Sequence, residues 1–102
     1  MDQIQELSRQ IGREFHPERV VLFGSYAYGT ATEDSDVDLL VVISHKGKGW
    51  RLAGKIRGRV CPQFPVDLLV RSPEQIRQRL KLGDCFLKEV TEQGKVLYES
   101  AG

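Results

Sequence analysis

Two carboxylates separated by one residue, Asp36 and Asp38, follow a Gly24-Ser25 pair after an interval of ten residues. The apolar residues before the pair have the length and β-branching of a buried strand. A helix that starts at Gly24-Ser25 would offer unpaired N–H groups and a partial positive charge, which suit a phosphate. Because side chains alternate along a strand, Asp36 and Asp38 point to the same side. Two carboxylates beside a phosphate site predict oxygen ligands for magnesium, the chemistry of nucleotide transfer.

A third carboxylate, Asp67, stands in a second copy of the same pentapeptide. Residues 66–70 repeat the VDLLV of residues 37–41, so two strands each open with an aspartate and run into the core. If these strands lie side by side, their backbones are about 4.8 Å apart, and Asp38 and Asp67 can share metal ions. A helical crossover between them would make the strands parallel. A lone aspartate at a strand start is usually an exposed turn residue, but the three together favour a metal site.

The pattern G-S-x10-D-x-D resembles the signature of the minimal nucleotidyltransferases, small members of the DNA polymerase β-like superfamily. The resemblance covers nearly the whole chain, from the strand at Val20 to a last strand near Leu97. It implies an α/β (α+β) fold in which a small mixed β-sheet is flanked by helices. It also implies transfer of a nucleoside monophosphate from a triphosphate to a hydroxyl, with release of pyrophosphate.

The resemblance also assigns roles to individual residues. Asp36 and Asp38 would hold two Mg²⁺ ions, and Asp67 would complete the site of the ion that activates the acceptor. Asp67 would either take the acceptor's proton or orient the acceptor. Gly24 and Ser25 would bind the terminal phosphates, with Gly24 allowing close approach of the backbone. The plainer alternative for Gly24 is a glycine that only ends a strand.

Relatives of this type are paired with HEPN-domain proteins as toxin–antitoxin modules and attach AMP to a tyrosine of the HEPN RNase toxin. The resemblance therefore implies an AMP-transferring antitoxin with ATP as substrate. Two alternatives remain open: a non-catalytic antitoxin that blocks its partner by contact alone, and a nucleotidyltransferase for small molecules. Tyr28 stands where many relatives have a basic residue, so one phosphate contact is missing.

The length of 102 residues predicts a single domain over residues 1–102, with no room for the helical domain that larger superfamily members close over their substrates. Either a protein acceptor completes the cleft, or a second subunit of a homo-oligomer does so. No apolar stretch is long enough to span a membrane, and the first residues lack the features of a secretion signal. Cys61 and Cys85 have no metal-ligand spacing, so we expect free thiols and a cytoplasmic location.

The charge distribution is uneven although the net charge is only +1, which predicts no membrane association and no direct binding of nucleic acid. No acidic residue lies between Leu39 and Val66, and this segment carries +6, which leaves −5 for the remainder. Its basic residues are Lys46, Lys48, Arg51, Lys55, Arg57 and Arg59. The segment is either a solvated helix face or a surface for triphosphate, RNA or an acidic partner. For Trp50, a place at the edge of the core is preferred over stacking on a base.

Hydrophobic periodicity and turn residues predict the order of the elements. The expected helices are 2–15, a short one after Gly24-Ser25, 50–60, 73–82 with Ser72 as N-cap, and 85–93. The expected strands are 19–23, 37–44, 65–71 and 96–98. The four-residue spacing of Gly54 and Gly58 predicts close packing of their helix against the sheet.

Overall fold

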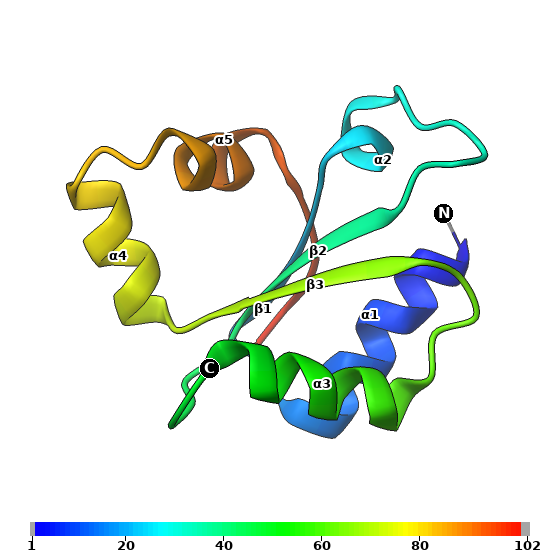
Figure 1. The fold of residues 1–102 in the computed structure, drawn as a ribbon, viewed down its shortest axis with the longest axis horizontal. Helices are drawn as coiled ribbons and strands as arrows, with labels where there is room; N and C mark the ends of the chain where they lie inside the picture. The colour runs from blue at the N-terminus through cyan, green and yellow to red at the C-terminus, as the bar shows by residue number, and fades with distance from the viewer. Residues whose placement is uncertain (1, 101–102) are drawn as a thin grey trace.

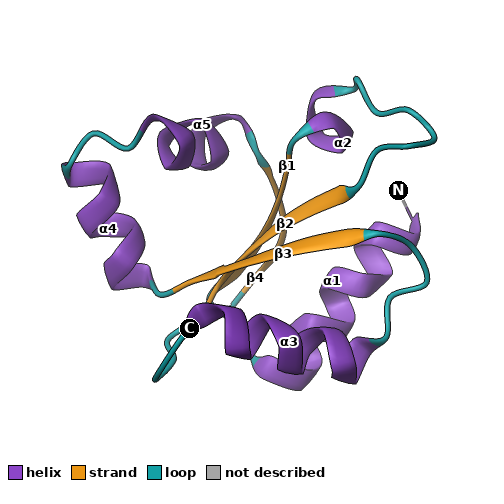
Figure 2. Cartoon of the chain, viewed as in Figure 1, coloured by secondary structure: helices purple, strands orange, loops and turns teal. Residues whose placement is uncertain are grey.

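The computed structural model describes residues 2–100, which form a four-stranded sheet with helices on both faces (Figures 1 and 2). The strands are β1 (Arg19–Phe23), β2 (Val37–Val42), β3 (Val66–Arg71) and β4 (Lys95–Glu99). The helices are α1 (Asp2–Phe15), α2 (Ser25–Tyr28), α3 (Gly49–Val60), α4 (Pro73–Lys81) and α5 (Cys85–Gln93). The strand order is β3-β2-β1-β4, with β1 antiparallel to both its neighbours and β2 parallel to β3. The predicted mixed sheet and the parallel pair are therefore confirmed.

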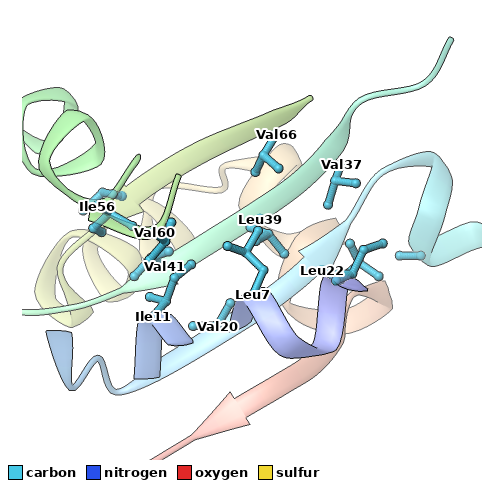
Figure 3. Close-up of a cluster of buried hydrophobic side chains, with 13 residues drawn as sticks. Leu7, Ile11, Val20, Leu22, Val37, Leu39, Val41, Ile56, Val60 and Val66 are labelled. Atoms are coloured by element: carbon cyan, nitrogen blue, oxygen red, sulfur yellow. The ribbon is translucent and has the colours of Figure 1, made fainter. Parts of the chain in front are cut away.

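Alternation along the strands divides the core into two layers. One face of the sheet packs against α1 and α3, and its cluster includes Leu7, Ile11, Leu39, Ile56 and Val60 (Figure 3). The other face packs against α4 and α5, in a smaller cluster that contains Val21, Leu40, Val42, Ile76, Leu87 and Val90. Residues of β2 with even numbers therefore face α4 and α5, and Asp38 belongs to that set.

Helix α3 connects the two parallel strands and lies on the sheet through Ile56 and Val60, which are buried. The prediction that Gly54 and Gly58 pack against the sheet is wrong: both are exposed, and a Cβ added to either would meet nothing within 4 Å. The prediction of a core-edge Trp50 is also wrong, because its side chain is 69% exposed. Successive residues of a helix are about 100° apart around its axis. Trp50, Gly54 and Gly58 therefore lie outside the face that carries Ile56 and Val60, and they point toward solvent.

The start of α4 matches its sequence signal. The Ser72 hydroxyl accepts from the Gln75 backbone N–H at 3.1 Å, and the Gln75 side chain accepts from the Ser72 N–H at 2.9 Å. This capping box satisfies two donors at the helix start, with Pro73 as the first helical residue. Among residues 2–100, no helix is long and apolar enough to cross a membrane.

Candidate active site

The aspartates of the two repeated pentapeptides are direct neighbours across the parallel pair of strands. Register pairs Val37 with Val66 and Asp38 with Asp67, so both carboxylates stand at the same end of the sheet. Asp36 immediately precedes β2 at that end. The side chains that follow on the same face, Leu40 and Leu69, contact the α4–α5 layer. The fold thus brings together the three acidic residues that the sequence predicted as one group.

The electrostatics of Asp38 show that the three carboxylates interact. Partial burial raises the pKa of Asp38, and the negative charges of Asp67 and Asp36 raise it further, together with a hydrogen bond shared with Asp67. Asp38 is half-buried, whereas Asp36 and Asp67 are exposed. The group therefore has an inner carboxylate and two outer ones that solvent or a second molecule can reach.

Gly24 meets Asp38 where β1 ends. The antiparallel register pairs Phe23 with Asp38, and Gly24 then leaves the strand with φ 75° and ψ −158°. A Cβ built on Gly24 would collide with the Asp38 carboxylate, so both the backbone angle and the contact require glycine. Gly24 therefore lies against the Asp38 carboxylate as well as ending β1.

Ser25, the residue after Gly24, is the first residue of α2 and is half-buried. The carbonyl of Gly24 accepts from the N–H groups of Ala27 and Tyr28, at 3.0 and 3.1 Å. The N–H groups at the start of a helix have no acceptor within it. The turn therefore places the hydroxyl and amide donors of Ser25 next to Gly24, which lies against Asp38, and such donors bind phosphate oxygens.

A hollow of about 690 Å³ lies between α2 and α5, next to this turn. Its lining includes Ala27 and Tyr28 from α2 and Cys85 and Lys88 from α5. Sequence reasoning missed Lys88 because no motif or spacing connects α5 to α2. Only the packing of α5 on the carboxylate face of the sheet brings this cation to the same side as Tyr28.

The three side chains supply the oxygen donors that magnesium prefers, but they do not form a ready-made metal site. Within residues 2–100, no three His, Cys, Asp or Glu side chains are already arranged to hold a metal ion. Carboxylate oxygens are the ligands that Mg²⁺ prefers. The mutual repulsion that raises the pKa of Asp38 would be relieved by a cation between the carboxylates. Asp36, Asp38 and Asp67 are therefore the residues that would hold it.

Comparison with known proteins agrees with this geometry. Residues 4–98 match the family model described as "Nucleotidyltransferase domain". A curated protein of Methanocaldococcus jannaschii, "Putative protein adenylyltransferase MJ0604", is 31% identical over 94 residues, which cover 78% of this chain and 77% of that protein.

Solved structures show the same fold. The crystal structure of a "putative nucleotidyltransferase" from Sulfolobus solfataricus superposes with a TM-score of 0.66 at 19% identity, covering 96% of this chain and 78% of that one. A second structure, of a toxin–antitoxin with AMP-PNP, superposes with a TM-score of 0.54 at 25% identity. This match covers 95% of this chain and 74% of that one.

Proposed function

Because the chain belongs to the nucleotidyltransferase domain family, we propose that it transfers AMP from ATP to a tyrosine hydroxyl of a HEPN-domain toxin and thereby acts as an antitoxin. The coarser activity follows from the family: the chain is a nucleotidyltransferase. One observation carries the proposal, namely the register that sets Asp38 beside Asp67 with Gly24 against the Asp38 carboxylate. A protein acceptor is supported by the curated relative named as a protein adenylyltransferase, and a toxin partner by the toxin–antitoxin structure that contains AMP-PNP.

In this proposal each site residue has a distinct task. Asp36, Asp38 and Asp67 would hold two Mg²⁺ ions, which would supply charge neutralisation at the phosphates and a lowered pKa for the attacking hydroxyl. Gly24 lets the backbone lie against the Asp38 carboxylate, where a side chain would collide, and Ser25 donates a hydrogen bond to a phosphate oxygen. Asp67 accepts the tyrosine proton, the new bond forms between the tyrosine oxygen and the α-phosphorus, and the bond from that phosphorus to pyrophosphate breaks.

The exposure of the outer carboxylates suits an acceptor as large as a folded protein. Asp36 and Asp67 are exposed, so a side chain presented on another molecule can reach them without entering a deep cavity. Phe86, which contacts Phe23 edge-on at 5.6 Å between ring centroids, is 49% exposed beside the same end of β1. An exposed aromatic next to the reacting groups is a contact that a protein partner can use.

The experiment that tests the proposal is the intact mass of a HEPN-domain toxin that forms a complex with this chain, after incubation with the chain, ATP and Mg²⁺. We expect the mass to rise in steps of one AMP. Asp38→Asn should slow the transfer by at least about 100-fold, the order of magnitude lost with one group that stabilises transition-state charge. Asp34→Asn is the matched control, because Asp34 is an exposed acid in the loop that precedes the site.

Three results would contradict the proposal. A stable complex without any gain in mass would replace it with neutralisation by contact alone. A normal rate of AMP transfer by Asp38→Asn would show that the carboxylates take no part in the reaction. Equal losses of transfer rate in Asp38→Asn and Asp34→Asn would show the same. Circular dichroism of both variants shows whether a loss reflects unfolding.

A further inference from the structure

Cations gather at the end of the sheet opposite the carboxylates. The segment after β2, residues 43–48, leaves the carboxyl end of that strand, whereas Asp38 lies at its amino end (Figure 1). A hollow of about 730 Å³ lies between this segment and the first turns of α3. Four cationic side chains line it: Lys46, Lys48, Arg51 and Lys55. We refer to this feature as the basic hollow.

The positive charge of the basic hollow is not neutralised by the chain. All four side chains are exposed, and within residues 2–100 none of them forms an ion pair. No acidic residue occurs in the sequence from Leu39 to Val66. A concave surface lined by one sign of charge concentrates the electrostatic potential, so the hollow attracts anions.

Trp50 is the sequence neighbour of Arg51, and its ring lies in solvent. Its side chain is 69% exposed, and the guanidinium of Arg51, which lines the hollow, lies 5.4 Å from the ring centroid. An exposed tryptophan flanked by cations offers a flat apolar face next to phosphate-binding groups.

His45 also lines the basic hollow, but both its ring nitrogens are buried and have no hydrogen-bond partner in the described part of the chain. Buried polar atoms are nearly always paired in folded proteins. Helix α3 also begins at the hollow, and its N-cap, Lys48, makes no side-chain capping bond.

We propose that the basic hollow and Trp50 together bind single-stranded nucleic acid, with backbone phosphates in the hollow and a base stacked on the indole. Three of the four cations are lysines, which bind phosphates well and are depleted at protein–protein interfaces. Stacking on Trp50 requires an unpaired base, since the bases of a duplex are already stacked. The net charge of +1 predicted no attraction to nucleic acid, but the fold concentrates cations on this one surface.

The chain supplies its own probe, because Trp50 is its only tryptophan. Titration with a single-stranded oligouridylate of about 12 nucleotides should quench Trp50 fluorescence at low salt. With three or four phosphates engaged, log K against log[salt] should have a slope between about −2 and −3. A second readout, the anisotropy of a labelled oligonucleotide, should give the same Kd.

Charge-reversal variants locate the site. Lys48→Glu and Arg51→Glu should each weaken binding at least tenfold, as should Trp50→Ala measured by anisotropy. Arg77→Glu and Lys81→Glu make the same change on exposed residues of α4, outside the hollow, and should weaken it less than threefold. Circular dichroism verifies that each variant is folded.

Several outcomes would overturn the assignment. If neither Trp50 fluorescence nor the anisotropy of the labelled oligonucleotide changes, the hollow does not bind nucleic acid. Equal losses in the α3 and α4 variants would reduce the binding to general charge attraction. Displacement of the oligonucleotide by equimolar inorganic triphosphate would make the hollow a site for small anions, and displacement by polyglutamate would make it a surface for an acidic protein.

Discussion

At the scale of single residues, Gly24 is the position where backbone conformation and site chemistry coincide. Gly24→Ala should cost about 1–3 kcal/mol because φ 75° with ψ −158° is a region that essentially only glycine adopts, and it should also displace the Asp38 carboxylate, which the new Cβ would meet. We therefore expect loss of nucleotide transfer together with reduced stability, measured by the transfer assay and by urea unfolding.

Gly29→Ala separates these two effects. Gly29 has a similar φ of 79°, but a Cβ there would meet nothing within 4 Å. Gly29→Ala should lose only the cost of a left-handed backbone, about 1–2 kcal/mol and less than Gly24→Ala, with transfer retained. If Gly24→Ala transfers AMP as fast as Gly29→Ala, close approach of Gly24 to Asp38 has no role in the reaction.

Asp38 makes stability depend on pH in the metal-free protein. Because its pKa is raised on folding, the native state holds this proton more tightly than the unfolded chain does. The free energy of unfolding should therefore fall as pH rises from the ordinary aspartate range through the raised pKa. With a chelator present, Asp38→Asn should have a higher urea midpoint than the natural chain at pH 7, and the gap should narrow toward pH 4.

The same measurement on Asp34→Asn controls for a change of net charge alone. This variant removes one negative charge outside the carboxylate group and should leave the midpoint nearly unchanged at pH 7. A gap between Asp38→Asn and the natural chain that widened in acid would have the wrong sign and would contradict the repulsion among the three carboxylates.

At the scale of elements, helix α3 has one face packed on the sheet and another face exposed to solvent. Gly54 and Gly58 lie in its interior with open space around them. Replacing either by alanine should stabilise the protein by about 0.5–1 kcal/mol, since glycine loses more backbone freedom on folding. Thermal or urea unfolding would measure this gain.

Gly12 of α1 is a control for the glycine-to-alanine substitutions in α3, because its surroundings are filled. It is a helical glycine too, but an added Cβ would collide with the Tyr98 ring. Gly12→Ala should therefore destabilise the protein, while Gly54→Ala and Gly58→Ala stabilise it. Destabilisation by the α3 substitutions would indicate that this helix face is covered in solution.

At the scale of the whole molecule, the two ends of the sheet carry opposite charge. The carboxylates occupy the amino ends of the parallel strands, and the basic hollow occupies the other end. A net charge of +1 conceals this separation. Under the two proposals above, one small sheet would bind a cation at one end and polyanions at the other without mutual neutralisation.

Magnesium should raise the melting temperature of the whole chain. A ligand that binds only the folded state adds about 2.7 kcal/mol of stability at 100 times its Kd. Thermal unfolding across a magnesium titration, at constant ionic strength, should show this rise in the natural chain and little of it in the double variant Asp36→Asn/Asp38→Asn. A rise of equal size in both proteins would exclude the carboxylates as the binding site.

Much of the fold was predictable because its signals are local. The helices begin and end within a residue or so of the predicted bounds, since hydrophobic spacing and caps such as Ser72 act over a few residues. Strand β2 was predicted to end at residue 44 but ends at Val42. Val42 pairs with Arg71, which is the last residue of β3. That limit depends on a neighbouring strand, which local periodicity does not describe.

Sequence alone was sufficient for the elements, the order of the acidic motifs and the parallel placement of Asp38 and Asp67, because each depends on residues close together or on a repeated pentapeptide. Three further facts required the folded chain: Trp50 is exposed, Gly24 touches Asp38, and Lys88 faces α2. These facts depend on which surfaces of distant segments cover one another. Packing between such segments is set by the whole core, so no short stretch of sequence contains it.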